Sequence, residues 1–269
     1  MKYTVSEKGI IATIPDFDLD ETLDCGQAFR WEKIDENTYK GAYLDKPLLI
    51  SKISDGQFLF ADTSEQDFLS VWCPYLDLDT DYSEIKSRIS ADDTMKKACE
   101  YASGIRLLRQ DSWEALCSFI ISQNNNIPRI KGIISRLTEH FSHFPTPLEL
   151  SRCTPDDLSF LRAGFRAKYL VDAAQKIISG EVSLERVRTA PIDEARKELM
   201  TIKGVGPKVA ECALLYGMYR TEAFPVDVWI KRVMEKWYPD GLPECCVGIE
   251  GIAQQYLFHY MRTFASKEV

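Results

Sequence analysis

The residues best suited to covalent chemistry lie in the last third of the chain. Lys208 follows Gly204-Val205-Gly206-Pro207, and Pro207 suits the first turn of a helix, so Lys208 is expected in that turn. Because the helix dipole disfavours a cation there, the amine is expected to serve as a nucleophile that forms a Schiff base. Cys212 lies four residues on, which places it on the same helical face. The alternative interpretation is a surface lysine that binds phosphate.

Asp227 is the second candidate for chemistry. It stands in Phe224-Pro225-Val226-Asp227-Val228-Trp229, directly before an amphipathic helix, and this position predicts that its carboxylate caps the helix. A carboxylate near Lys208 could also stabilise positive charge that develops on a sugar, or orient an attacking group. Capping alone is the alternative, and the two roles are compatible.

The hairpin before Lys208 predicts an anion site made of backbone groups. An amphipathic helix from Asp193 to about Ile202 leads into it, and Gly204 and Gly206 allow another chain to approach closely. A hairpin beside a helix N-terminus exposes N–H groups that can hold a phosphate without many lysines. An ordinary helical hairpin with glycines in its turn is the alternative.

Composition and charge limit the class of protein. The formal net charge of −8 argues against a nucleic-acid binder with a basic stripe, although local potential and backbone donors leave that class open. The eight cysteines form no CxxC pair and no zinc pattern, so we expect reduced thiols, no metal ligands and no iron–sulfur cluster. No apolar run approaches the roughly 20 residues that span a bilayer, so no membrane association is expected.

The elements that must position these residues predict an α+β protein. Residues 1 to about 75 alternate in the manner of strands, as at Phe29 and Trp31, with turns at Asp35-Glu36-Asn37 and Asp55-Gly56. From about residue 83 the apolar spacing becomes helical, and Thr154-Pro155-Asp156-Asp157 predicts a capped helix start. We therefore predict an N-terminal antiparallel β-sheet domain over residues 1–100 and an all-α domain over residues 101–269.

The hairpin, Lys208 and the Pro-Val-Asp element together resemble the helix-hairpin-helix glycosylase superfamily of DNA base-excision repair, also called HhH-GPD. Further segments resemble the 8-oxoguanine DNA glycosylases of the eukaryotic type, and the matches run from residue 25 to about 260. These segments are Cys25-Gly26-Gln27-Ala28-Phe29-Arg30-Trp31, Gly104-Ile105-Arg106-Leu107-Leu108-Arg109-Gln110-Asp111, Ser122-Gln123-Asn124-Asn125-Asn126-Ile127 and Gly164-Phe165-Arg166-Ala167-Lys168-Tyr169.

The resemblance implies a bifunctional enzyme. In this family a lysine attacks C1′ of the damaged nucleotide and expels the base, and the resulting imine undergoes β-elimination of the 3′ phosphate. By position in the motif, Lys208 is the nucleophile and Asp227 the catalytic carboxylate. The resemblance also implies preferential excision of 8-oxoguanine opposite cytosine. A monovalent cation at the hairpin of residues 203–208 is usual in the superfamily, and no other cofactor is implied.

The resemblance also assigns contacts to the two bases of the damaged pair. Gly26, Cys212, Gln254 and Phe258 match the base pocket, in which the glycine carbonyl accepts from the N7–H of 8-oxoguanine. Asn124 matches the residue inserted into the vacated space, and Arg129 and Arg166 match the readers of the estranged cytosine. From the residues alone, Asn124 to Asn126 could instead be a turn cluster, and Phe258 a core aromatic.

Two positions depart from the animal enzymes. Phe165 replaces a tyrosine as the intercalating aromatic, which costs little because the ring alone supplies the shape. Trp229 replaces a histidine, and because an indole has one N–H and no basic nitrogen, its phosphate contact is in doubt. The backbone of Gly204, Val205, Gly206 and Val228 completes the expected DNA contacts.

The alternatives are a related glycosylase for another base and a non-catalytic binder of bent DNA. The combination of Lys208 with Asp227 disfavours both the purely hydrolytic glycosylases and a binder that uses the hairpin alone. The expected partner is double-stranded DNA containing 8-oxoguanine, bound by a monomer. A bacterial cytoplasm with association to the nucleoid is the expected location, or the nucleus if the source is eukaryotic.

Overall fold

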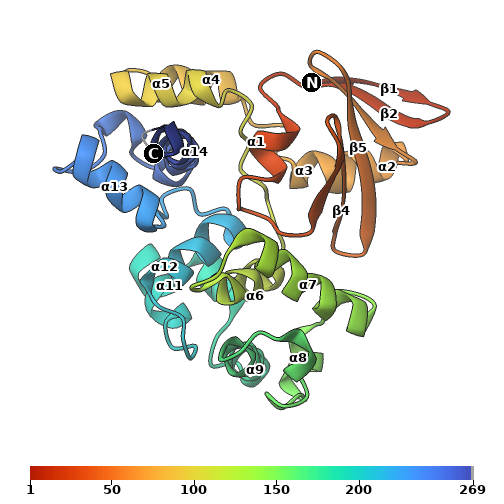
Figure 1. The fold of residues 1–269 in the computed structure, drawn as a ribbon, viewed down its shortest axis with the longest axis vertical. Coiled ribbons are helices and arrows are strands. Elements are labelled where there is room, and N and C mark those ends of the chain that lie inside the picture. The colour runs from red at the N-terminus through yellow and green to blue at the C-terminus, as the bar shows by residue number, and fades with distance from the viewer. Residues whose placement is uncertain (268–269) are drawn as a thin grey trace. The chain divides into compact units, whose positions relative to one another are not determined.

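The computed structural model describes residues 1–267, with side chains up to Arg262. The chain forms two compact units. Unit 1 comprises Met1–Arg109 and Val226–Val269, and unit 2 comprises Gln110–Pro225. The helices and strands of each unit can be identified in Figure 1, where the colour follows the residue number.

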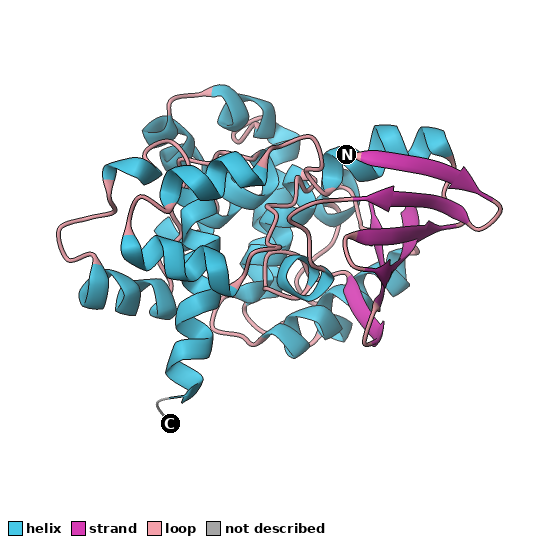
Figure 2. Cartoon of the chain, turned by 90° about the horizontal axis from the view of Figure 1, so that it is seen from above, coloured by secondary structure: helices cyan, strands magenta, loops and turns pink. Residues whose placement is uncertain are grey.

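Unit 1 contains one antiparallel sheet in the order β1-β2-β6-β5-β4-β3, drawn in magenta in Figure 2. Its strands are β1 (Lys2–Ser6), β2 (Gly9–Thr13), β3 (Trp31–Asp35), β4 (Thr38–Tyr43), β5 (Lys46–Ser54) and β6 (Gln57–Ala61). In β5, Leu48 and Ile50 are buried while Leu49 between them is 40% exposed, which is the period of two that a sheet with one covered face requires. Tight turns follow β3 and β5, where Asp35 and Asp55 stand in the sequence.

Unit 1 also contains helices, and those from Leu19 to Leu23 and from Glu65 to Tyr75 cover the buried face of the sheet. The helices of unit 1 are α1 (Leu19–Leu23), α2 (Glu65–Asp67), a π-helix (Phe68–Trp72), α3 (Cys73–Tyr75), α4 (Tyr82–Ile89), α5 (Asp93–Tyr101), α13 (Val228–Trp237), a 3₁₀ helix (Glu244–Cys246) and α14 (Glu250–Lys267). The aromatic core joins both layers, since the Trp31 indole N–H donates to the Tyr75 hydroxyl at 2.8 Å. The last segment of the chain returns to this unit, where the Tyr238 hydroxyl donates to Asp92 at the start of α5.

Unit 2 is built from helices. They are α6 (Ser112–Ser122), α7 (Ile127–Phe141), α8 (Pro147–Ser151), a 3₁₀ helix (Ser159–Leu161), α9 (Arg166–Ser179), α10 (Leu184–Thr189), α11 (Ile192–Leu199), α12 (Pro207–Cys212) and a π-helix (Ala213–Gly217). Helix α6 is buried on nearly every side, from Trp113 to Ile121, and is the central helix of this unit. The amphipathic helices α7 and α9 pack against it, so that their polar faces remain outside.

The predicted α+β fold, a sheet domain followed by helices, is confirmed. Two local expectations are wrong. The first 75 residues are not all strand, because Leu19–Leu23 and the stretch from Glu65 to Tyr75 are helical. Thr154 and Asp157 do form the predicted capping bonds, yet the chain makes only a turn there and then the 3₁₀ helix Ser159–Leu161.

Candidate active site

The hairpin between α11 and α12 has the geometry that its glycines predict. Gly204 has φ of +79°, and a Cβ on it would lie 2.3 Å from the Tyr169 ring, so no larger residue fits. The Val205 N–H donates to the Ile202 carbonyl at 3.0 Å, and the Lys203 N–H donates to Asp172 of α9 at 2.7 Å. In the described part of the chain, the N–H groups of Gly204 and Gly206 have no such partner. They are therefore the donors best placed for an anion.

Lys208 lies in the first turn of α12, as predicted from Pro207 at the helix start. Its side chain is half-buried, and Nζ lies 5.6 Å from the centroid of the Phe119 ring on α6. Phe119 in turn stacks on Tyr216 at 4.9 Å between centroids. The Phe119 ring thus covers one side of the amine and keeps water from that side. Cys212, one turn further along α12, is buried.

A buried carboxylate on the same helix was not found by sequence reasoning. Glu211 accepts a hydrogen bond from Arg196 of α11 with one oxygen, and from the Phe224 N–H at 2.7 Å with the other. It therefore ties α11 and α12 to the chain that leads into the Pro-Val-Asp element. The signal was available, because Glu211 interrupts the otherwise apolar run Val209-Ala210-Glu211-Cys212-Ala213, and a buried charge needs partners.

In unit 1, Asp227 caps α13, which confirms the predicted capping role. Its Oδ1 accepts from the N–H groups of Trp229 at 2.9 Å and Ile230 at 2.8 Å. Both bonds use the same oxygen. Among the described residues no bond to Oδ2 is present, so this second oxygen can act on another group without breaking the cap.

The residues after Asp227 present an exposed surface at the start of α13. Val228 is 68% exposed, and the Trp229 ring is half-buried beneath the Arg232 guanidinium, at 4.8 Å from its centroid. A histidine at this position would add a basic nitrogen. Here the positive charge instead comes from the arginine one turn later, stacked on the indole.

A buried group of hydrogen bonds in unit 1 connects the residue before Gly26 with Gln254, one of the predicted base-pocket residues. The Cys25 Sγ lies 3.5 Å from the Thr22 carbonyl and 3.6 Å from Gln255 Oε1, so its one proton has two acceptors, and Gln255 Nε2 donates to Gln254 Oε1 at 2.9 Å. Burial raises the pKa of the Cys25 thiol to about 11, so it remains a donor. Gly26, with φ of +91°, follows Cys25 directly. The segment that carries Gly26 is thereby fixed to helix α14, which carries Gln254 and Phe258.

Gln27 has a structural function that the motif alone did not reveal. Its Nε2 donates to the carbonyls of Thr22 at 2.9 Å and Arg106 at 2.8 Å, and its Oε1 accepts from the Leu108 N–H at 2.9 Å. These three bonds hold Gln27, the residue after Gly26, against the backbone of Thr22, Arg106 and Leu108.

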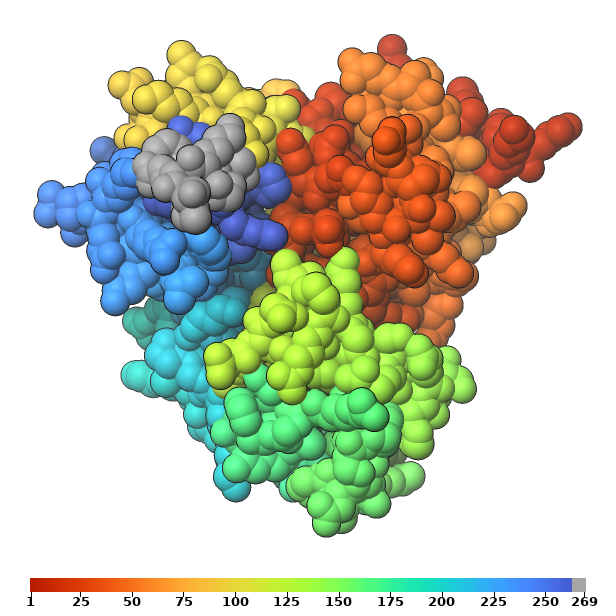
Figure 3. All heavy atoms as spheres, viewed as in Figure 1, coloured from red at the N-terminus to blue at the C-terminus, as the bar shows by residue number. Residues whose placement is uncertain are grey.

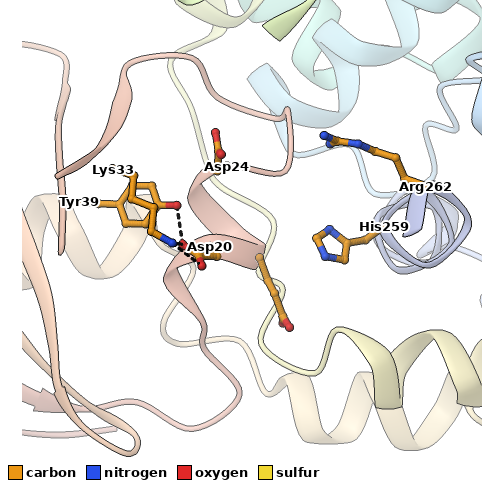
Figure 4. Close-up of a pocket in the computed structure, with 7 residues that line it drawn as sticks. Asp20, Asp24, Lys33, Tyr39, His259 and Arg262 are labelled. Carbon is orange, nitrogen blue, oxygen red and sulfur yellow. Dashed lines mark hydrogen bonds and ion pairs between the residues drawn. The ribbon is translucent and has the colours of Figure 1, made fainter. Parts of the chain in front are cut away.

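Helix α14 also borders a cavity of about 480 Å³. In Figure 4, His259 and Arg262 point from α14 toward Asp24 and Asp20 of the α1 segment. The Asp20 carboxylate accepts from Lys33 at 2.6 Å and from the Tyr39 hydroxyl at 2.6 Å. The cavity walls carry three carboxylates, Asp20, Glu21 and Asp24, against the two cations Lys33 and Arg262. The Arg262 guanidinium lies 5.9 Å from the Phe258 ring.

The Asn124 loop comprises residues 123–126, between α6 and α7 in unit 2. It is a turn cluster, as one interpretation of the sequence predicts, and it also exposes Asn124, as the other requires. Asn125 donates to the Ile121 carbonyl at 3.2 Å, and Asn126 caps α7 by accepting from the Arg129 N–H at 3.0 Å. Asn124 is exposed, makes no such bond among the described residues, and is the asparagine of this loop with a positive φ, +46°. Two asparagines therefore build the turn and present the third to solvent.

A basic surface with an exposed aromatic ring lies beside this loop. Phe165 is 46% exposed and precedes α9. It lines a cavity of about 500 Å³ together with Arg129, Arg162 and Lys168. In Figure 3 the yellow-green atoms of the α7 segment and the green atoms that follow them form one continuous surface in unit 2. An aromatic ring among cations is the composition that binds nucleic acid.

The predicted site residues are distributed over both units. Unit 2 holds Asn124, Arg129, Phe165, Arg166, Gly204, Val205, Gly206, Lys208 and Cys212, and unit 1 holds Gly26, Asp227, Val228, Trp229, Gln254 and Phe258. Within the described residues, no group of three or more His, Cys, Asp or Glu side chains could hold a metal ion. The described helices include none that is long and apolar enough to cross a membrane.

Family models match the chain over two adjoining spans. Residues 10–116 match the N-terminal domain of 8-oxoguanine DNA glycosylase, and residues 117–241 match the HhH-GPD superfamily of base excision DNA repair proteins. The sheet and the helix-hairpin-helix element thus define a base-excision repair protein. The two units and the two family spans divide the chain at different residues, so the predicted boundary at residue 100 stays a prediction.

Individual relatives show which family of base-excision repair proteins the chain resembles. The N-glycosylase/DNA lyase of Saccharomyces cerevisiae is 31% identical over 255 residues, which cover 82% of this chain and 68% of the yeast protein. The structure of MBOgg1 in complex with a low-affinity DNA ligand is 41% identical, with a TM-score of 0.89 over 98% of this chain and 100% of that chain. The chain belongs to the 8-oxoguanine DNA glycosylase family, and the predicted enzyme class, a DNA N-glycosylase and lyase, is confirmed.

A further solved structure bears on the substrate. It is the 8-oxoguanine glycosylase/lyase of Clostridium acetobutylicum, in complex with double-stranded DNA containing cytosine opposite 8-oxoguanine. It is 37% identical, with a TM-score of 0.90 over 98% of this chain and 99% of that chain.

Proposed function

We propose that this protein excises 8-oxoguanine from double-stranded DNA and then cleaves the strand, with Lys208 as the nucleophile. The observation that carries the proposal is the position of Lys208, in the first turn of the helix after a Gly-Val-Gly hairpin and against the Phe119 ring. Membership in the 8-oxoguanine DNA glycosylase family supports the substrate.

The proposed reaction has two stages. The Lys208 amine attacks C1′ of the flipped nucleotide. The N-glycosidic bond breaks, its electron pair goes to the base, and the base takes up a proton and leaves. The amine nitrogen loses its protons and the sugar ring opens, which yields an imine between Lys208 and C1′. Loss of a proton from C2′ then expels the 3′ phosphate by β-elimination, and water releases the lysine.

Asp227 is proposed to stabilise the positive charge that develops on the sugar. The Oδ1 atom is held by two backbone N–H groups, so the carboxylate is oriented before the substrate arrives. An oriented charge costs no reorganisation during the reaction, which makes it effective in catalysis.

Base selection is proposed to depend on Gly26, Gln254, Phe258 and Cys212. A carbonyl at Gly26 that faces N7 gains a hydrogen bond from 8-oxoguanine and faces a lone pair in guanine. The bonds of Gln27 and the chain from Cys25 to Gln254 support this role, because they limit the movement of the carbonyl. Phe258 would stack on the base and Gln254 would bond its pairing edge.

Binding to DNA is proposed to use local groups, since the whole chain carries a net charge of −8. The donors at the hairpin are the N–H groups of Gly204 and Gly206, with Lys203 exposed beside them. Carbonyl oxygens of this hairpin are the donor type for a monovalent cation, which would screen the phosphate. Arg129 and Arg166 are proposed to read the opposite cytosine, and Asn124 and Phe165 to fill the space that the flipped nucleotide leaves.

Borohydride trapping tests the proposal directly. Incubation with a duplex that contains 8-oxoguanine opposite cytosine should yield a covalent protein–DNA adduct in the wild type and none in Lys208→Gln. A duplex with guanine in place of the lesion is the matched control. An adduct of equal yield in Lys208→Gln would assign the chemistry to another amine, and binding without any adduct would favour a non-catalytic DNA-binding protein.

A further inference from the structure

The hairpin between α11 and α12, residues 203–206, has little internal hydrogen bonding. The Val205 N–H donates to the Ile202 carbonyl at 3.0 Å, and in the described part of the chain no other N–H of these four residues donates within the hairpin. A loop with so few bonds of its own opens easily unless other elements hold it. The contacts that keep its shape must therefore come from outside.

One face of helix α9 supplies these contacts. Tyr169, Asp172 and Lys176 stand at positions i, i+3 and i+7, so they lie on the same side of the helix. The Asp172 carboxylate accepts from the Lys203 N–H at 2.7 Å. The Lys176 ammonium donates to the Thr201 carbonyl at 2.6 Å. Two side chains of α9 thus hold the backbone on entry to the hairpin.

Tyr169 packs against the next residue of the hairpin. A Cβ on Gly204 would lie 2.3 Å from the Tyr169 ring, so the ring lies directly against this glycine. Gly204 is nevertheless exposed. The side of the glycine that Tyr169 does not cover is therefore open to a ligand.

Asp172 is the member of this face whose charge does not suit a DNA-binding surface. A carboxylate beside a group of N–H donors repels a phosphate that approaches them. Its bond to the Lys203 N–H is charge-assisted, and such bonds are roughly twice as strong as those between neutral groups. The bond also directs the Lys203 N–H toward α9. The following N–H, that of Gly204, is left without a protein partner among the described residues.

We propose that Asp172 is a positioning residue for DNA binding, which fixes the hairpin so that the N–H groups of Gly204 and Gly206 donate to a phosphate of the DNA backbone. The inference rests on the proposed function, in which these two groups hold the phosphate. Asp172 itself does not touch DNA. Its repulsion of the phosphate is offset because donors that are already in place need no ordering when the phosphate binds.

The test measures Kd for a duplex that carries a tetrahydrofuran abasic analogue, which has no base to excise. Asp172→Ala and Asp172→Asn are compared with the wild type, and Glu198→Ala is the matched control. Glu198 of α11 also accepts a backbone N–H at 2.7 Å, from Ser183, and it pairs with Arg186 at 2.6 Å. Thermal unfolding is recorded on the same samples, and Kd is referred to the folded fraction.

The sign of the change in Kd distinguishes the possible roles of Asp172. Asp172→Ala should weaken binding on the order of tenfold, because the hairpin loses its bond to α9. Asp172→Asn keeps an acceptor oxygen and removes the repulsive charge, so it should bind at least as tightly as the wild type. Glu198→Ala should lower Tm without weakening binding. Tighter binding by both Asp172 variants would show a mere surface charge and would overturn the inference.

A second measurement relates the effect to a phosphate. A set of duplexes carries one neutral methylphosphonate at each position around the abasic analogue. At the phosphate that the hairpin holds, neutralisation should weaken the wild type and have much less effect in Asp172→Ala, because the contact is already impaired. Losses that multiply fully at every position would overturn the inference, since Asp172 would then act on no particular phosphate.

These results are distinguishable from a failure of the proposed function. A wild type that gives no adduct in borohydride trapping would overturn the proposed reaction, whereas the binding assay, which involves no excision, would still decide the role of Asp172. A wild type with no affinity for the abasic duplex would overturn both the proposed function and the inference.

Discussion

Replacing Asp227 can separate its role as a helix cap from its proposed role in catalysis. Oδ1 accepts two N–H bonds at the start of α13, and asparagine has an oxygen in the same place. Asp227→Asn should therefore keep the cap, and the free energy of unfolding should change by less than about 0.5 kcal/mol. Asp227→Ala removes both bonds, which should cost about 1 kcal/mol and lower Tm by roughly 2–4 °C for a chain of this size.

Both variants remove the charge, so both should lose turnover alike. Loss of an oriented group that stabilises developing charge costs about 3 kcal/mol, or on the order of 100-fold in rate. The assay is single-turnover release of 8-oxoguanine, with thermal unfolding measured on the same samples. Near-normal turnover in Asp227→Asn would refute the catalytic role and leave Asp227 as a cap. A fall in turnover that followed Tm across the two variants would refute it as well.

The remaining predictions concern the nucleophile, the opposite base and the hairpin. Lys208→Gln should lose base release and strand cleavage together, and gel assays measure this loss. Its Kd for damaged DNA, measured by fluorescence anisotropy, should change by less than about threefold, because the hairpin donors are unchanged. Wild-type excision should be on the order of ten to a hundred times faster opposite cytosine than opposite adenine, and Arg129→Ala should reduce this ratio; equal rates in the wild type would contradict the cytosine contact. Gly204→Ala should destabilise the protein by at least about 1–2 kcal/mol in denaturant unfolding, because φ is +79° and the Tyr169 ring occupies the space for a Cβ. Unchanged stability would mean that the hairpin can rearrange.

The parts of the site that depend on local sequence could be predicted. Pro207 starts α12, Asp227 caps α13, and the glycines form the hairpin, since each of these signals acts within a few residues of itself. The change from strand to helical periodicity predicted that the sheet precedes the helices, because periodicity is also a local property of the sequence.

The parts that depend on distant partners could not be predicted. Nothing near Gln27 in the sequence indicates that it bonds to Arg106 and Leu108, and nothing near Glu211 indicates Phe224. The Thr154–Asp157 capping pair shows a related limit. Its bonds form as the sequence predicts, but a cap only starts a helix, and the residues that follow must bury an apolar face for the helix to continue.

The discontinuity of unit 1 has a consequence for synthesis on the ribosome. Unit 2 is a continuous segment, Gln110–Pro225, so it can fold while the rest of the chain is still being made. Unit 1 needs α13 and α14, which are translated after unit 2, to complete its contacts with Cys25 and Asp92. Under the proposed function, a nascent chain would carry Lys208 and the DNA-contacting loops before it carried Asp227 or Phe258. Under that function, the nascent chain would become able to cut DNA only after α13 and α14 have been translated.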